Sequence, residues 1–300
     1  MSINKWLYIV INLLFTTNLL ANNGPGPVNE NIRFVNISNR DGLPNNTIYT
    51  LCQDYKGFIW IGTVNGLCRY DGNNIITYIS DEKNLLPNNR IRFVFEDNKY
   101  RLWISTLKGI HLYDRDSDTF MPVDDQQSPY NSKTIHQAAD STIYFGGGGR
   151  NCFFDEDKYT FEQLKIDNEN INGDFNAIIS DKDGFLWVGS EKGGILCIDR
   201  KRNKLRHYKY DPKSKDSLIS NNIQTLYKDS KNKIWVGTQN KGVCYYDEQN
   251  DKFVSFDKIP EAYVRVISED IYNNIWIGTE DGLYIYNQQT DEIIVKKRDK

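Results

Sequence analysis

Six residues at equivalent positions of a repeated motif supply the side chains best suited to bind a ligand. Five of the six stand eleven positions before the tryptophan that opens a W-I/V-G-T-like segment, and Ile135 stands nine positions before Tyr144. They are Tyr49, Arg92, Ile135, Asn176, Gln224 and Arg265. All but the isoleucine are polar or amphipathic, inside stretches that are otherwise apolar. Guanidinium, amide and phenol groups hydrogen-bond to hydroxyls and carboxylates. The set therefore predicts a site for a sugar, especially an acidic one.

The segments after these aromatic residues carry a second group of polar side chains. These are Asn65, Lys108, Arg150, Lys192 and Asn240. We expect them to extend the same binding surface as the first group. The alternative is that both groups only keep this surface hydrated.

The spacing of the remaining reactive side chains reveals no catalytic or metal-binding set. Asp181–Gly184 resembles a calcium loop, but the later ligands and the bidentate glutamate of such a loop are missing. Gly146–Gly149 lacks the Lys-Ser/Thr of a phosphate loop. The three histidines, His111, His136 and His207, fall in different repeats. We therefore expect no catalysis, no metal site and no cofactor.

The aromatic segments recur through most of the chain. They are WIGT at 60–63, WIST at 103–106, YFGG at 144–147, WVGS at 187–190, WVGT at 235–238 and WIGT at 276–279. In five copies an aspartate stands six residues before the tryptophan: Asp54, Asp97, Asp181, Asp229 and Asp270. In the third copy, Asp140 stands four residues before Tyr144. Asp followed by Gly is typical of a tight turn, where the carboxylate bonds nearby backbone and glycine adopts a positive φ.

Each repeat has the pattern of four short strands joined by turns. In the first copy they are expected at 47–53, 58–63, 67–71 and 74–80, where β-branched and aromatic residues dominate. Four antiparallel strands recurring at about 43 residues predict an all-β fold, a β-propeller. The six predicted blades are 43–80, 86–123, 130–166, 172–210, 218–257 and 260–297.

One further strand is expected before the first blade, at 31–38, because NIRFVNIS resembles the outer strands of other repeats. The sixth blade already has an outer strand of its own at 292–297. The extra strand therefore predicts an incomplete seven-bladed ring, cut before its seventh blade is complete. The alternative is a six-bladed ring with an additional N-terminal strand.

The N-terminus has the pattern of a secretion signal. A short start with one lysine, an apolar run at 6–20 and a small residue, Ala21, predict a signal peptide at 1–21 and a linker at 22–30. An uncleaved anchor is the alternative. The net charge of −3 gives no indication of nucleic acid as a partner. Of the five cysteines, Cys52 and Cys68 lie in the first repeat, and Cys152, Cys197 and Cys244 lie in three others. We expect small buried side chains there rather than disulfides.

Two copies resemble a known repeat in detail. DGLPNNTIYTLCQDYKGFIWIGTVNGLCRYDG (41–72) and SLISNNIQTLYKDSKNKIWVGTQNKGVCYYD (217–247) are similar to the two-component regulator propeller repeat. The resemblance extends over 32–297, and the third copy departs most. In that family such propellers form the periplasmic sensor region of hybrid two-component histidine kinases, which often detect oligosaccharides. The usual plan adds a second propeller, a β-sandwich, a membrane helix and a kinase, none of which this sequence contains.

The resemblance implies a periplasmic, ligand-sensing propeller module that recognises an oligosaccharide and has no catalysis of its own. The expected partners are a small oligosaccharide, the remaining blades, the second propeller and the membrane-linked kinase part of a larger receptor, and a second copy in a homodimer. A secreted propeller enzyme, a lyase or glycosidase acting on glycans, is one alternative, and an interaction scaffold is another. An enzyme needs a carboxylate pair or a Tyr/His pair at the site. The six equivalent positions hold no acid, which favours binding.

Overall fold

The computed structural model describes residues 34–80, 86–123, 128–148, 150–166, 169–170, 173–201 and 203–297. The chain divides into two compact units, Val35–Phe175 and Asn176–Lys300, which are described separately. The predicted signal peptide (1–21), the linker (22–30) and residues 31–33 lie outside the described residues. These assignments stay predictions.

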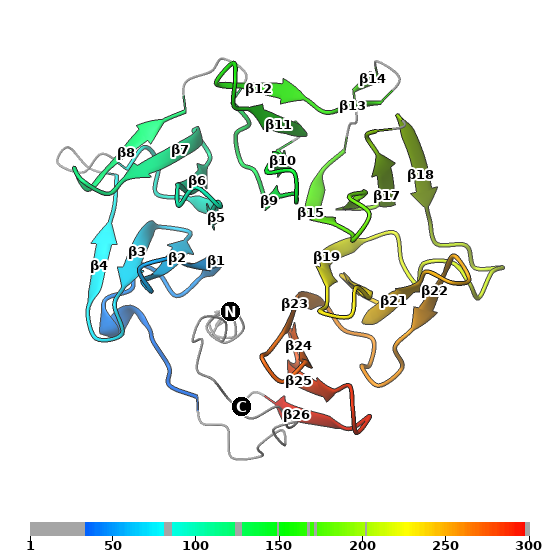
Figure 1. Ribbon diagram of the computed structural model, residues 1–300. Helices are drawn as coiled ribbons and strands as arrows, with labels where there is room; N and C mark the ends of the chain where they lie inside the picture. Colours follow the sequence, from blue (N-terminus) through cyan, green and yellow to red (C-terminus); the bar gives the residue numbers. More distant parts are fainter. Residues whose placement is uncertain are drawn as a thin grey trace. The chain divides into compact units, whose positions relative to one another are not determined.

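The first unit contains three four-stranded antiparallel sheets, whose strands are adjacent in chain order (Figure 1). The first sheet consists of β1 (Ile48–Gln53), β2 (Ile59–Thr63), β3 (Gly66–Tyr70) and β4 (Ile75–Tyr78). The second consists of β5 (Ile91–Glu96), β6 (Leu102–Thr106), β7 (Gly109–Asp114) and β8 (Thr119–Pro122). The third consists of β9 (Thr134–Gln137), β10 (Ile143–Gly146), β11 (Cys152–Asp155) and β12 (Thr160–Gln163). A hairpin of β13 (Lys165–Ile166) and β14 (Glu169–Asn170), which the sequence pattern does not predict, follows the third sheet.

The second unit repeats the same arrangement three times. The fourth sheet consists of β15 (Phe175–Ser180), β16 (Leu186–Ser190), β17 (Gly194–Asp199) and β18 (Lys204–Tyr208). The fifth consists of β19 (Ile223–Lys228), β20 (Ile234–Thr238), β21 (Val243–Asp247) and β22 (Lys252–Ser255). The sixth consists of β23 (Val264–Glu269), β24 (Asn274–Thr279), β25 (Gly282–Asn287) and β26 (Ile293–Lys297). Six four-stranded antiparallel blades confirm the predicted all-β propeller fold.

The predicted N-terminal outer strand at 31–38 is wrong over its described part. Residues 34–38 have irregular backbone, and a short 3-10 turn, η1 (Asn39–Asp41), follows. Val35 is 86% exposed, so this stretch has the composition of a strand without the burial of one. An extended segment becomes a strand only when a neighbour pairs with its backbone. The seventh blade inferred from this segment stays a prediction.

In five blades an aspartate, buried in four of them and half-buried at Asp181, connects the turn to the tryptophan that follows it. In the five blades with the six-residue spacing, the indole Nε1 donates to an Asp Oδ2 over 2.8–2.9 Å. The other carboxylate oxygen accepts two backbone N–H groups of the same turn, for example those of Lys231 and Lys233 on Asp229. In the third blade, Tyr144 has no indole N–H, and exposed Asp140 accepts only the Thr142 backbone N–H over 3.0 Å. The recurring aspartate is therefore a structural element of the hairpin.

The glycine of the W-I/V-G-T segment allows neighbouring blades to approach closely. A Cβ added at Gly62 would lie 2.5 Å from Cγ2 of Thr50 and 2.7 Å from Cγ2 of Ile91, on the next inner strand. Gly237 is enclosed in the same way, 2.6 Å from Thr225 and Val264. Because protein interiors are close-packed, a methyl group here would push the inner strands apart.

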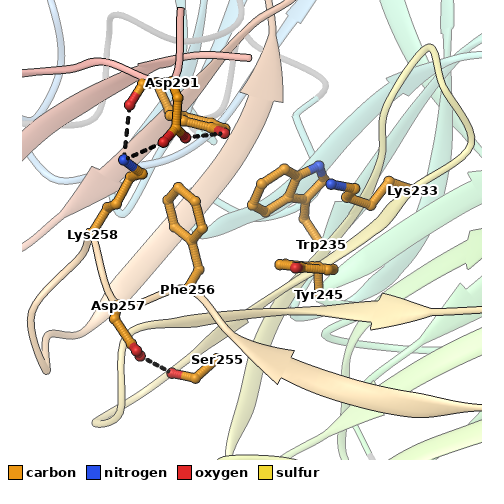
Figure 2. A pocket seen from close by; sticks show the side chains of 9 residues that line it. Lys233, Trp235, Tyr245, Ser255, Phe256, Asp257, Lys258 and Asp291 are labelled. Atoms are coloured by element: carbon orange, nitrogen blue, oxygen red, sulfur yellow. Dashed lines mark hydrogen bonds and ion pairs between the residues drawn. The ribbon is translucent and has the colours of Figure 1, made fainter. Parts of the chain in front are cut away.

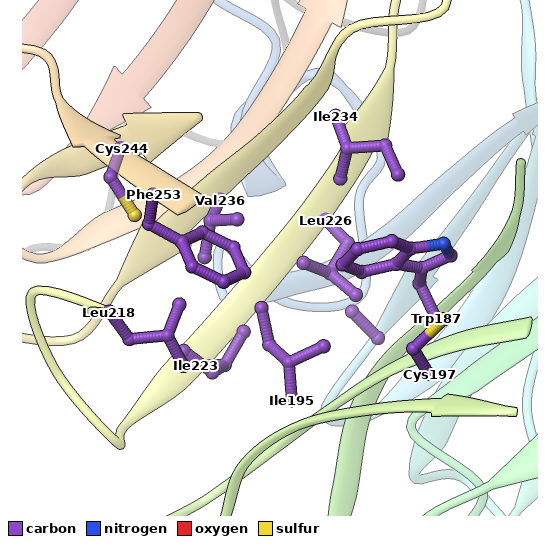
Figure 3. Close-up of a cluster of buried hydrophobic side chains, with 11 residues drawn as sticks. Trp187, Ile195, Cys197, Leu218, Ile223, Leu226, Ile234, Val236, Cys244 and Phe253 are labelled. Atoms are coloured by element: carbon purple, nitrogen blue, oxygen red, sulfur yellow. The ribbon is translucent and has the colours of Figure 1, made fainter. Parts of the chain in front are cut away.

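Hydrophobic side chains from adjacent blades form one core between them. Figure 3 shows the cluster that joins the fourth and fifth sheets. It contains Ala177, Trp187, Ile195, Cys197, Leu218, Ile223, Leu226, Ile234, Val236, Cys244 and Phe253. Four of the cysteines are buried and Cys52 is half-buried, which agrees with their predicted packing role. Cys68, Cys152 and Cys244 also share one register position, opposite Ile61, Phe145 and Val236.

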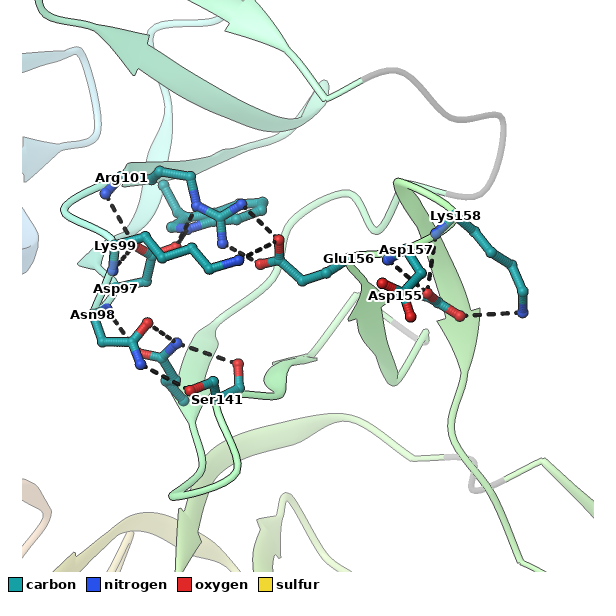
Figure 4. Close-up of polar contacts among 11 residues, drawn as sticks. Asp97, Asn98, Lys99, Arg101, Ser141, Asp155, Glu156, Asp157 and Lys158 are labelled. Atoms are coloured by element: carbon teal, nitrogen blue, oxygen red, sulfur yellow. Dashed lines mark hydrogen bonds and ion pairs between the residues drawn. The ribbon is translucent and has the colours of Figure 1, made fainter.

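Ion pairs supplement this packing between blades of the first unit. Arg101, on the turn between β5 and β6, donates from Nε to Asp97 over 2.6 Å. The same guanidinium binds Glu156, beyond β11 of the third sheet (Figure 4). Lys99 contacts Glu156 as well, over 2.9 Å. One carboxylate from the third blade therefore neutralises two cations of the second.

His111 on β7 makes the stability of this unit depend on pH. Its side chain is buried, Nδ1 has no hydrogen-bond partner among the described residues, and burial lowers its pKa from 6.5 to about 4. Between these pH values the His111 side chain is therefore protonated in the unfolded chain and neutral in the folded chain. We expect stability to fall by about 1.4 kcal/mol per pH unit as the pH drops from 6.5 to about 4. Urea unfolding at several pH values checks this, and His111→Gln should flatten that part of the profile.

Candidate functional site

Four of the residues predicted to bind ligand occupy β-bulges on the innermost strands. The register between inner strand and neighbour shifts at Tyr49 on β1, Arg92 on β5, Gln224 on β19 and Arg265 on β23. A bulged residue is unpaired in the ladder, and its side chain is redirected. Ile135 in the third blade is different, because β9 pairs with β10 in regular register and its side chain is buried. The visible sign of the bulges in the sequence is a polar residue inside an apolar strand.

The first unit brings Tyr49 and Arg92 into contact. The guanidinium of Arg92 lies over the Tyr49 ring, 4.7 Å from its centroid. Arg90, which the sequence argument did not select, donates to the Tyr49 hydroxyl over 3.1 Å and also lies over the ring, at 5.8 Å. Two cations therefore share one aromatic face, which a cation–π contact stabilises in part.

The charge of Arg92 is poorly compensated. Burial lowers the pKa of its guanidinium, Tyr49 and the carboxylate of Asp174 raise it in part, and neighbouring Arg90 lowers it further. Its Nε is buried and has no hydrogen-bond partner among the described residues. The nearby carboxylate of Asp174 binds Lys133 instead, over 2.5 Å. An anion that approached Arg92 would gain a charge-assisted hydrogen bond that the protein itself does not supply.

The second unit brings Gln224 and Arg265 together through Tyr263, which is not among the predicted residues. The Tyr263 hydroxyl donates to Gln224 Oε1 over 2.8 Å, and Arg265 lies 3.6 Å from the centroid of the Tyr263 ring. Arg265 also pairs with Glu280. The six equivalent positions themselves hold no acid, but the carboxylate of Glu280 lies beside one of them. Glu280 precedes β25 in the chain, so spacing along the repeat does not reveal that it reaches the bulge.

The remaining predicted residues have mixed surroundings. Asn176 on β15 donates to the Ile223 carbonyl over 2.9 Å, so at least one of its amide groups connects two inner strands. Asn240 is exposed and accepts from Ser220 over 3.0 Å. Asn65, Lys108 and Lys192 are exposed, whereas Arg150 is half-buried. A common function of the predicted residues in the two units stays a prediction.

The described residues contain no group of three or more His, Cys, Asp or Glu side chains that could hold a metal ion. No helix in this described part is long and apolar enough to cross a membrane.

Repeated four-stranded blades with polar residues on inner-strand bulges define a repeat-built β-propeller. Residues 42–65, 85–108, 170–192, 217–240 and 258–281 match the family model described as "Two component regulator propeller". These five repeats belong to this family of propeller repeats.

Solved structures agree with this assignment. The extracellular domain of the putative hybrid two component system BT3049 from B. thetaiotaomicron is 21% identical over 89% of this chain, with a TM-score of 0.76. The extracellular domain of BT4673 from the same organism is 26% identical over 85%, with a TM-score of 0.69. This chain spans 37% and 36% of those two domains. Virginiamycin B lyase from Staphylococcus aureus has the same fold, with 14% identity over 84% of both chains and a TM-score of 0.62. No curated protein matches this sequence.

Proposed function

We propose that this chain is the ligand-sensing propeller part of an exported two-component signalling receptor, and that it binds an oligosaccharide bearing a carboxylate. The family and the similarity to extracellular domains of two-component systems support the sensory role. The same similarity and the apolar N-terminal run support export to the periplasm. Binding without catalysis is part of the proposal.

The observation that carries the ligand class is Arg92. It is a half-buried cation on a bulge, without an ion pair among the described residues, and it lies against the face of Tyr49. A sugar ring presents apolar C–H groups to an aromatic face and hydroxyls to polar neighbours. A carboxylate on that sugar would pair with the guanidinium of Arg92. Tyr49, Asn176, Gln224 and Arg265, with the loop residues Asn65, Lys108, Arg150, Lys192 and Asn240, are proposed as further contacts.

Calorimetric titration tests the site. A uronic-acid oligosaccharide and a neutral oligosaccharide of the same length are titrated into the wild-type chain and into Arg92→Met. We expect the acidic sugar to bind more tightly, and its affinity to fall by about tenfold in the variant, since one charge-assisted hydrogen bond is worth about 1.5–3 kcal/mol. Arg265→Met is the matched control. Its cation is already neutralised by Glu280, so a smaller loss is expected.

Two results would contradict the proposal. One is the absence of binding by either sugar, and the other is equal affinity of wild type and Arg92→Met for the acidic sugar. Incubation of the same sugars with the protein, followed by chromatography, tests catalysis. Cleaved or unsaturated products would show that the chain is an enzyme and would contradict binding without catalysis.

A further inference from the structure

Three blades share a tyrosine and an aspartate at the hairpin between their third and fourth strands. The pairs are Tyr113 with Asp118, Tyr246 with Asp251 and Tyr286 with Asp291. In each pair the aspartate has a left-handed backbone, with φ of 54°, 48° and 61°. Each pair faces the tryptophan of the preceding blade, so the chain contains three versions of one interface.

In two of these interfaces, polar side chains fill the space in front of the tryptophan. Between the first and second sheets, Tyr78 donates to Asp118 over 2.7 Å, and Arg69 lies over the Trp60 ring at 5.8 Å. Arg69 also reaches Asp118, at 3.7 Å. The tyrosine hydroxyl and the guanidinium therefore occupy the space in front of the tryptophan.

The interface between the fourth and fifth sheets is filled by the same chemistry. Tyr208 donates to Asp251 over 2.8 Å and stacks on Trp187 with centroids 5.6 Å apart. Arg206, two residues earlier on β18, lies 3.9 Å from Asp251. This guanidinium comes from the fourth strand instead of the third.

The third interface, between the fifth and sixth sheets, has neither the fourth-strand tyrosine nor the arginine of the other two. Phe256 pairs with Val243 where Tyr78 pairs with Leu67, and it has no hydroxyl to donate. Tyr245 stands opposite Trp235 and Val254 stands opposite Tyr245, so neither position of this row holds the arginine of the other interfaces. The cation that neutralises Asp291 is now Lys258, beyond the end of β22, at 3.0 Å. A cavity of about 450 Å³ opens in place of the missing side chains (Figure 2).

The cavity combines aromatic walls with an uncompensated cation. Trp235, Tyr245, Phe256 and Tyr286 line it. The ammonium of Lys233 lies 4.4 Å from the Tyr245 centroid and 5.3 Å from that of Trp235. Lys233 is half-buried, and its ammonium contacts only these rings within the described chain. Lys258, in contrast, is already neutralised by Asp291.

We propose that this cavity between the fifth and sixth blades binds a small carboxylic acid built on a six-membered ring. The carboxylate pairs with Lys233, and the ring lies against the aromatic walls. The volume is that of a small-molecule pocket, and its lining combines four aromatic residues with five polar ones, among them Asp257 and Asp291. Asp257 accepts a hydrogen bond from Ser255 and Asp291 pairs with Lys258, so both carboxylates already have partners. Aromatic acids and uronic acids share this chemistry. The site uses none of the residues of the Arg92 group and does not rest on the proposed function.

Ligand-observed NMR and chemical-shift titration of the chain with benzoate, glucuronate and neutral glucose test the proposal. At least one acid should bind in the millimolar range, as expected for so small a ligand, while glucose should bind more weakly. Lys233→Gln should weaken the acid about tenfold. Lys231→Gln is the matched control, because Lys231 is exposed on the same turn and should leave binding unchanged.

A second variant fills the cavity from within. Val254→Arg combined with Phe256→Tyr copies Arg206 and Tyr208 of the filled interface, and should fold and lose acid binding. Binding of benzoate alone assigns the site to aromatic acids, and binding of glucuronate alone to uronic acids. The proposal is overturned if neither acid binds, if Lys231→Gln weakens binding as much as Lys233→Gln, or if the folded double variant binds as well as wild type.

Discussion

Replacement of Arg115 by methionine is expected to lower the free energy of unfolding by about 3–5 kcal/mol, the range for breaking a buried ion pair from one side. Arg115 follows β7 and donates to Asp54 over 2.8 Å and to Glu96 over 2.6 Å. The Asp54 side chain is fully buried, so the variant leaves a buried carboxylate without its cation. It also leaves two carboxylates facing one another across the first and second blades.

Chemical denaturation at neutral pH measures this loss. Burial already raises the pKa of Glu96, and removal of Arg115 should raise it further. Protonation of Glu96 then relieves the repulsion, so the difference from wild type should shrink as the pH falls through the raised pKa. Lys182→Met is the control, because its pair with Glu248 is exposed and should contribute little. Equal effects of the two substitutions would show that Arg115 does not hold the blades together.

Replacement of Asp229 by alanine should be comparably severe. Asp229 is buried and accepts the Trp235 indole N–H over 2.9 Å and the backbone N–H groups of Lys231 and Lys233. Without the carboxylate, the buried indole donor loses its partner and the turn loses two hydrogen bonds. At about 1–3 kcal/mol for an unsatisfied buried donor, the total expected loss is about 3–5 kcal/mol.

The third blade supplies the matched control for this prediction. Asp140→Ala removes the equivalent aspartate where no tryptophan depends on it, so the loss should stay under about 1 kcal/mol. Asp229→Asn should be intermediate, because its amide keeps one acceptor oxygen but turns donors toward Trp235. Tryptophan fluorescence and denaturation read out both effects. An Asp140→Ala loss as large as that of Asp229→Ala would refute the role given to the indole bond.

Much of the candidate site follows from repeat position alone. The polar residues at 49, 92, 224 and 265 stand out against apolar strands, and the structure places each of them on a bulge. Their partners do not follow from position. Arg90 and Tyr263 both stand two residues before a bulged residue, but other copies have other residue types there, so only the folded chain shows which side chains reach the bulge. Glu280 stands four residues after Trp276, where most other copies have a residue without a carboxylate.

The blades and the hydrogen bonds within them follow from the order of the residues. The aspartate and the tryptophan of one hairpin lie six residues apart, so the contact is local and recurs wherever both residues do. The contacts between blades depend on the tertiary structure. Arg115 meets Asp54 across 61 positions and Tyr78 meets Asp118 across 40, and these pairings depend on how sheets stack. The same dependence explains the two departures from pattern. Residues 34–38 form no strand, because pairing is not encoded in their composition. The cavity beside Lys233 exists because Phe256 and Val254 replace groups whose role appears only when blades pack together.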